Sequence, residues 1–200
     1  LCGRWQAYGG IYHPFTQDAQ VAVRMAARLQ CQTICLPFVL EGGAIDGDGR
    51  GTLLASRRSI VCEKRNRGLS IDHLEALIQH HLGVDQVLWI DACLEGDDTD
   101  GHVDQLVRFV SPGTVLVAQQ PDPLDPAHSM LCRLQRQLRS ARDATGRPLE
   151  VIPVDLPTAQ FWDGRRLPAS HLNFHIGNHA VYMPAFGCGD RKSTRLNSSH

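Results

Sequence analysis

Residues 70–90 read SIDHLEALIQHHLGVDQVLWI and predict one α/β unit. Ser70 carries a side chain that caps helix N-termini, and Gly83 suits a helix C-terminus, with apolar residues at helical spacing between them. The apolar run at 86–90 that follows predicts a short buried strand. A capped helix that leads directly into such a strand is typical of an α/β fold, which is the fold class we expect.

The same order of elements recurs along the chain. A helix is predicted to begin with Thr16 as N-cap, and another with Asp125 as N-cap and Pro126 in the first turn, ending at Gly146. The three helix starts, at Thr16, Ser70 and Asp125, are 54 and 55 residues apart. Short apolar runs predict strands at residues 34–40, 52–55, 59–62, 86–90, 105–110, 114–118, 151–154, 171–176 and 180–183. The regular spacing indicates a repeated module of two or three strands and one helix.

Composition excludes several classes of function. The 200 residues are 42% hydrophobic, enough for a single core, and the net charge is −1. The basic residues are dispersed, so we expect no nucleic-acid partner, and no apolar run is long enough to span a membrane. The seven cysteines are odd in number and sit mostly in apolar runs, which is typical of a reducing cytoplasm. Cys31 and Cys35 have no matching pair elsewhere, so a structural zinc site is not expected.

The stretch DDTDGHVD at residues 97–104 places His102 among four carboxylates. Such a density of negative charge costs stability unless a cation binds there, and a guanidinium substrate would supply the cation beside a proton-transfer group. A divalent metal is the first alternative, and a solvated acidic loop is the second. Upstream, Glu41 ends an apolar run and is followed directly by Gly42 and Gly43.

Several segments together resemble the agmatine deiminase family, which includes bacterial peptidyl-arginine deiminases. They are residues 38–45, 48–52, 64–66 and 98–104, with flanking matches at 5–10, 173–174 and 184–187. The match covers nearly everything from residue 4 to residue 187. The resemblance implies a five-bladed α/β propeller in which each module is one blade. This chain would be a partial propeller with about three of the five modules.

The resemblance also assigns roles to three residues. His102 would be the proton shuttle, Glu41 would orient and charge its imidazole, and Asp104 would bind the guanidinium. We expect the two residues on a strand, where the two-residue spacing places His102 and Asp104 on one face. Read alone, each could equally be a solvated surface residue. The implied enzyme converts agmatine, a small guanidinium substrate, to N-carbamoylputrescine and ammonia through a cysteine thioether, without a metal or an organic cofactor.

Two features of the family pattern are missing from this sequence. The family has an Arg-Asp-x-Gly-Pro motif before the part that this chain matches, and its nucleophile lies in a late Gly-rich His-Cys segment. Cys188 is the only late cysteine and lacks that context, so we expect the nucleophile to lie outside this fragment and the chain alone to be inactive. A peptidyl-arginine deiminase, a catalytically dead guanidine-binding module and a metal-dependent hydrolase remain as alternatives.

The end of the sequence differs from the rest. Residues 191–200 have no apolar periodicity and resemble a translated sequencing adapter. We therefore expect a partial deiminase domain over residues 1–189 and a non-native tail over 190–200. A cytoplasmic location is expected, and the resemblance allows a homo-oligomer in the full-length protein.

Overall fold

The computed structural model describes residues 2–187, so the predicted domain boundary and tail lie outside the described residues. The strands are β1 (Cys2–Arg4), β2 (Cys35–Val39), β3 (Ile45–Gly47), β4 (Thr52–Ser56), β5 (Gln86–Ile90), β6 (Val107–Ser111), β7 (Thr114–Gln119), β8 (Glu150–Asp155), β9 (Phe161–Trp162), β10 (Arg165–Arg166), β11 (His175–Ile176) and β12 (Val181–Tyr182). The α-helical segments are α1 (Ala7–Gly10), α2 (Val21–Arg28), α3 (Arg57–Ile60), α4 (Glu63–Asn66), α5 (Ile71–Leu82) and α6 (Pro126–Ser140). Short 3₁₀ turns lie at η1 (Asp18–Gln20), η2 (Gly42–Ala44) and η3 (Val103–Gln105).

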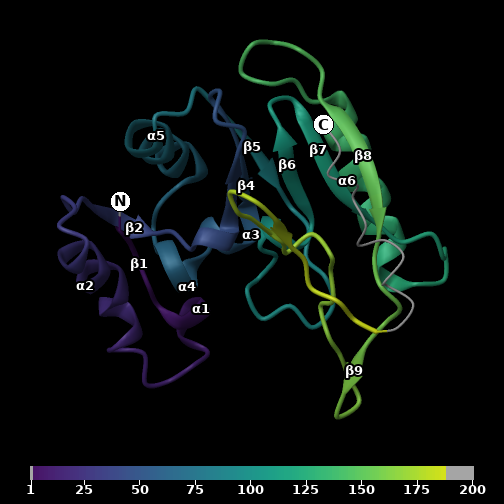
Figure 1. The fold of residues 1–200 in the computed structure, drawn as a ribbon, viewed down its shortest axis with the longest axis horizontal. Helices are drawn as coiled ribbons and strands as arrows, with labels where there is room; N and C mark the ends of the chain where they lie inside the picture. Colours follow the sequence, from purple (N-terminus) through teal and green to yellow (C-terminus); the bar gives the residue numbers. More distant parts are fainter. Residues whose placement is uncertain (1, 188–200) are drawn as a thin grey trace.

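Two sheets have the same topology, as the predicted repeat requires. In each, an antiparallel pair is followed by a helix and then by a strand parallel to the second, giving the orders β3-β4-β5 and β6-β7-β8. Helix α5 lies in the first crossover and α6 in the second, and the two sheets stand side by side (Figure 1). The parallel pair β1-β2, with α2 between its strands, repeats the last part of this unit.

Strand β4 is buried on both faces and links the two modules. Leu53 and Ala55 pack in a cluster with Leu74 and Ile78 of α5, whereas Leu54 belongs to the cluster of the second module. Successive side chains of a strand point to opposite faces, so one strand can serve both cores. This packing also brings the inner turns η2 and η3 into contact.

The start and end signals of α5 are confirmed. The Ser70 hydroxyl accepts the His73 amide at 3.2 Å, and Gly83 adopts the left-handed conformation at φ 66°. Asp125 likewise caps α6 by accepting the Ala127 amide at 2.8 Å. These two helices and the strands that follow them lie close to where the sequence predicts them.

Other predicted elements are wrong or shifted. Residues 59–62 do not form a strand, because Ser56 caps a helical turn by accepting the Ser59 amide, and α3 results. Helix α6 ends at Ser140, not at Gly146, because the chain turns back at Asp143. The predicted strand at 105–110 begins later, after η3, and the one at 171–176 shortens to β11.

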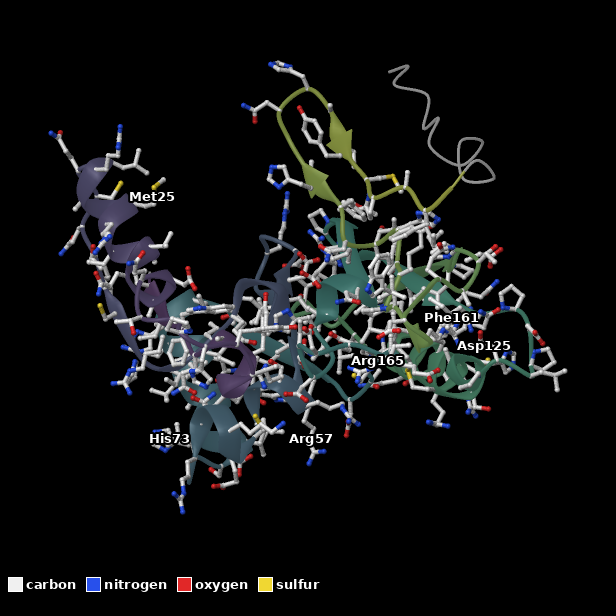
Figure 2. All side chains as sticks on the ribbon, turned by 90° about the horizontal axis from the view of Figure 1, so that it is seen from below. Met25, Arg57, His73, Asp125, Phe161 and Arg165 are labelled. Carbon is white, nitrogen blue, oxygen red and sulfur yellow. The ribbon has the colours of Figure 1, made fainter. Side chains whose placement is uncertain are left out.

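Helix α2 also differs from its prediction. It begins at Val21 after η1, and no side chain caps its start, so Thr16 is not its N-cap. No residue of α2 is buried. Its apolar residues face outward, as the labelled Met25 does at the edge of the molecule (Figure 2). Within residues 2–187, no helix is long and apolar enough to cross a membrane.

The short hairpin β9-β10 was not predicted. Asp163 and Gly164 form its two-residue turn with φ values of 49° and 71°, and an Asp-Gly pair is a strong hairpin signal in a sequence. Arg166 anchors the hairpin through two hydrogen bonds to Asp125, at 3.0 and 2.7 Å. The labelled Phe161 and Arg165 lie on this hairpin in Figure 2.

Candidate active site

Glu41 lies where the chain leaves β2 and enters η2, and its side chain is almost fully buried. One carboxylate oxygen accepts Arg65 Nε at 3.0 Å. The other accepts the Ser59 hydroxyl at 3.3 Å and faces His102 Nε2 at 2.8 Å. Burial alone would raise the pKa of Glu41, but the hydrogen bonds from His102 and Arg65 outweigh burial and lower it. Glu41 is therefore an ionised carboxylate with both oxygens hydrogen-bonded.

Arg65 is the site residue to which the sequence analysis gave no role. It lies on α4 with its side chain buried, and it donates to Glu41, to Asp100 Oδ2 at 2.7 Å and to the Thr99 carbonyl at 3.1 Å. The guanidinium therefore joins the turn that holds Glu41 to the loop that carries His102. The sequence offered this arginine only within the matching segment 64–66.

Asn66, next along α4, fixes the backbone at the end of β2. Its side-chain amide donates to the carbonyls of Val39 and Ile60 at 3.0 and 2.9 Å, and its oxygen accepts the Val39 amide at 2.8 Å. All of its hydrogen bonds here go to buried backbone groups, which are costly to leave unpaired. Asn66 thus sets the position from which Glu41 points at the imidazole.

His102 is buried and precedes η3. Its backbone amide donates to the Thr99 hydroxyl at 3.2 Å. Because Nε2 faces a carboxylate, we assign the Nε2 proton to the bond with Glu41, which leaves Nδ1 on the other side of the ring. A Cβ added at Gly43 would lie 2.5 Å from His102 Nδ1, so only a glycine leaves space there.

Asp104 lies on the Nδ1 side of the imidazole. The same imagined Cβ at Gly43 would also collide with Asp104 Oδ2, so both polar atoms border one small space. Oδ1 of Asp104 is buried and has no hydrogen-bond partner among residues 2–187. Burial raises the pKa of Asp104 in spite of the lowering effects of His102 and Arg108. A half-buried carboxylate with one unpaired buried oxygen is suited to receive a cationic donor.

The predicted reason for the closeness of His102 and Asp104 is wrong. Residues 103–105 form the 3₁₀ turn η3, and the strand β6 begins only at Val107. The two side chains meet because this turn packs against η2, and not because they alternate along a strand.

The acidic stretch is less open to an external cation than its sequence suggests. Asp97 organises the loop by accepting the Thr99 amide and hydroxyl, at 2.9 and 2.6 Å, and the Gly101 amide at 3.0 Å. Asp100 pairs with the protein's own Arg65, and Asp98 accepts the Tyr12 hydroxyl. Among residues 2–187, no three His, Cys, Asp or Glu side chains are placed to hold a metal ion together.

Cys93 contacts this loop, with its sulfur 3.8 Å from Asp97 Oδ2. Burial, followed by the charge of Asp97, raises the pKa of its thiol to about 11. A nucleophilic cysteine needs a lowered pKa, so Cys93 is unsuited to attack a guanidinium. Cys188, the weak candidate of the sequence, lies outside the described residues.

The sequence of this chain is similar to those of known deiminases. A family model described as Porphyromonas-type peptidyl-arginine deiminase matches residues 3–198. The agmatine deiminase of Stutzerimonas stutzeri is 36% identical over 198 residues, covering 90% of this chain and 54% of the relative. The agmatine deiminase of Pseudomonas fluorescens is 34% identical over 197 residues, with 89% and 54% covered. The chain therefore spans about half the length of the curated relatives it matches.

Solved structures agree with the sequence relatives. The agmatine deiminase of Enterococcus faecalis superposes with a TM-score of 0.86 at 29% identity, over 96% of this chain and 58% of that one. A substrate-bound agmatine deiminase of C. jejuni has a TM-score of 0.86 at 26% identity, with the same shares covered. These structures belong to the five-bladed propeller fold, so the predicted fold class is confirmed for the part that this chain covers.

Proposed function

The chain belongs to the Porphyromonas-type peptidyl-arginine deiminase family, and on that premise we propose that it carries the acid–base and guanidinium-binding part of an agmatine deiminase active site. One observation supports this most strongly. His102 faces the ionised carboxylate of Glu41 at 2.8 Å, and its Nδ1 borders the same small space beside Gly43 as Asp104 Oδ2. A substrate guanidinium can bind on this side of the imidazole, because its N–H groups would satisfy Asp104 in the way that Arg65 satisfies Glu41.

The proposed reaction follows from these positions. A cysteine thiolate, which we expect to lie outside residues 2–187, attacks the guanidinium carbon and forms a C–S bond. His102 enters this step as the imidazolium, protonated at both ring nitrogens. The C–N bond breaks, and Nδ1 gives its proton to the departing nitrogen, which leaves as ammonia. Water then attacks the amidino-thioether while His102 accepts a proton from it. The thiolate leaves, and the ureido product N-carbamoylputrescine remains.

Glu41 and Asp104 would have different roles in these steps. Glu41 holds the ring through Nε2 and stabilises the imidazolium, so that the proton is exchanged at the opposite nitrogen. Asp104 would bind the guanidinium and balance its charge. Arg65 would keep Glu41 ionised while the imidazole changes its charge.

The charge around Tyr8 favours agmatine over an arginine side chain in a peptide. Burial raises the pKa of the Tyr8 phenol, and four carboxylates raise it further. In decreasing effect, these carboxylates belong to Glu41, Asp98, Asp104 and Asp97. Agmatine carries a second cation, its ammonium group, whereas a peptide chain around arginine is neutral. The excess negative charge near the imidazole thus suits a dication.

The test is product analysis on the protein read from the gene with its flanking sequence. We expect agmatine to give N-carbamoylputrescine and ammonia in equal amounts, and His102→Asn to abolish both, with His128→Asn as the control. Turnover of a peptidyl-arginine substrate without turnover of agmatine would instead support the peptidyl-arginine deiminase alternative. Guanidine binding without either reaction would support the catalytically dead module.

The chain by itself should release no ammonia from agmatine. Ammonia release that disappears in Cys188→Ser would contradict this and would identify that cysteine as the nucleophile. A cytoplasmic location and a homo-oligomer remain part of the proposal, and both are open to fractionation and sedimentation experiments on the longer protein.

A further inference from the structure

Segment α1 is one turn of left-handed helix placed against the imidazole. Four consecutive residues have positive φ: Ala7 at 49°, Tyr8 at 55°, Gly9 at 77° and Gly10 at 85°. The turn is closed by hydrogen bonds from the Gly10 amide to the Gln6 carbonyl, at 2.7 Å, and from the Ile11 amide to the Ala7 carbonyl, at 3.0 Å. Left-handed conformation is unfavourable for residues with a Cβ, so Ala7 and Tyr8 are held in it at a cost.

The turn delivers the Tyr8 ring to His102. The two rings meet edge to face with their centroids 5.8 Å apart. Trp5 packs behind Tyr8 in the same manner, with centroids 4.8 Å apart. Edge-to-face packing has a preferred geometry, so the Tyr8 ring restricts rotation of the imidazole away from Glu41.

The same turn rests on α4, the segment that carries Arg65. A Cβ added at Gly9 would lie 3.0 Å from Lys64 Cβ and 3.7 Å from Arg65 Nη1. Any side chain at position 9 would therefore push the turn away from α4. This contact links the position of Tyr8 to Arg65, which holds Glu41. Tyr8 and Glu41, the two neighbours of the His102 ring, are therefore both positioned by α4.

We propose that Tyr8 is a positioning residue for His102, and that the left-handed turn Ala7–Gly10 is maintained in order to place its ring there. This extends the proposed function, since it takes His102 as the proton-transfer group. The contact itself is nevertheless a matter of geometry and can be tested without turnover. A strained turn is expected where surrounding structure compensates its cost and where the side chain that it delivers has a use.

The experiment measures the rate at which diethyl pyrocarbonate modifies each histidine of the chain, resolved by peptide mass spectrometry. We expect Tyr8→Ala to raise the rate at buried His102 about tenfold, because the ring that covers the imidazole is gone. The rate at His73, which is exposed on the outer surface (Figure 2), should not change. Tyr8→Phe keeps the ring and should keep the slow rate at His102.

Tyr12→Ala is the matched aromatic control. Tyr12 packs edge to face on Tyr8, with centroids 6.1 Å apart, and no ring contact joins it to His102. An equal rise at His102 in Tyr12→Ala, or no rise in Tyr8→Ala, would overturn the proposal. A fast rate in Tyr8→Phe would overturn it too, because the hydroxyl and not the ring would then matter.

A pair of glycine variants tests the turn with Tyr8 still present. Gly9 and Gly68 have nearly the same φ, 77° and 75°, but an added Cβ at Gly68 would meet nothing within 4 Å. Both alanine variants bear similar backbone strain, so only Gly9→Ala should speed the modification of His102. Urea unfolding first checks that the two variants have similar unfolding free energies. Equal modification rates at His102 in the two variants would then contradict the role of the turn. Either result is independent of whether the longer protein is a deiminase.

Discussion

Glu41 and Asp104 are two carboxylates beside one imidazole, and their surroundings are opposite. Glu41 has a partner for each oxygen, drawn from Arg65, Ser59 and His102. Asp104 is half-buried, yet its Oδ1 has no hydrogen-bond partner in the part of the chain that the structure describes. The pKa of Glu41 is lowered and that of Asp104 is raised. One carboxylate is thus part of the folded framework, while the other carries a cost that a bound cation would remove.

The difference indicates that the turns η2 and η3 have separate roles in the site. The turn η2 presents a residue whose interactions are complete within the chain. The turn η3 presents one whose Oδ1 has no partner among the described residues, and the proposed function assigns a ligand to it. Functional sites commonly keep such unfavourable groups, which lower stability and gain binding in return. The sign of the stability change in each carboxylate variant therefore separates the two roles.

The largest effect is expected from Glu41→Gln. The buried guanidinium of Arg65 would lose one of its two charged partners, the one at 3.0 Å, and keep Asp100 at 2.7 Å. Breaking a buried ion pair costs about 3–5 kcal/mol when the remaining charge is left alone, so we expect a loss of unfolding free energy of about 3 kcal/mol. Urea unfolding at pH 7 measures the change, with exposed Glu63→Gln as the control. A loss similar to that of the control would show that Glu41 is not part of the framework.

Asp104→Asn should have the opposite sign. Asp104 is half-buried, and burial raises its pKa, so removing its charge is expected to increase the unfolding free energy by about 1 kcal/mol at pH 7. Asp98→Asn is the matched control, since Asp98 already accepts the Tyr12 hydroxyl. Destabilisation by Asp104→Asn would mean that the carboxylate has a partner in solution, and the contrast with Glu41 would fail.

The pH dependence of stability sharpens the contrast. Because the folded pKa of Glu41 is lowered, its contribution is present above the ordinary value of 4.5 and is lost as the pH falls through the lower folded value. For Asp104 the folded pKa is raised, so stability falls as the pH rises from 3.8 through the higher folded value. The gain from Asp104→Asn should therefore vanish below about pH 3.8 in urea titrations. A gain that persists there would not arise from charge.

Local signals in the sequence predicted the parts of the fold that depend on local chemistry. The caps at Ser70, Gly83 and Asp125 act within a few residues, and the helices α5 and α6 begin where those signals lie. The strand predicted at residues 59–62 was wrong because a run of four residues is too short to distinguish the spacing of a strand from that of a helix. The cap from Ser56 favours the helical turn α3. The Asp163-Gly164 pair is a local signal of the same kind, and it would have predicted the hairpin β9-β10.

The candidate site likewise contains residues that the sequence indicates and residues that only the structure shows. His102 and Asp104 stood out by the density of carboxylates in residues 97–104, and Glu41 by its place before two glycines, while the family resemblance supplied their roles. Arg65 acts on Glu41 from 24 positions away in the sequence, and no periodicity or spacing predicts a pair of that kind. The left-handed turn at Ala7–Gly10 was equally hidden, because two of its residues are not glycine. Long-range partners and strained turns need the three-dimensional arrangement.

Agmatine binding tests the central claim most directly, namely that Asp104 awaits a guanidinium. Titration calorimetry on the chain should show weak binding, with Kd on the order of millimolar, since only part of the site is present. We predict that Asp104→Asn abolishes the binding while Glu63→Gln leaves it unchanged, and that putrescine, which lacks the guanidinium, binds far more weakly. Equal affinity of agmatine for the wild-type chain and for Asp104→Asn would contradict the account.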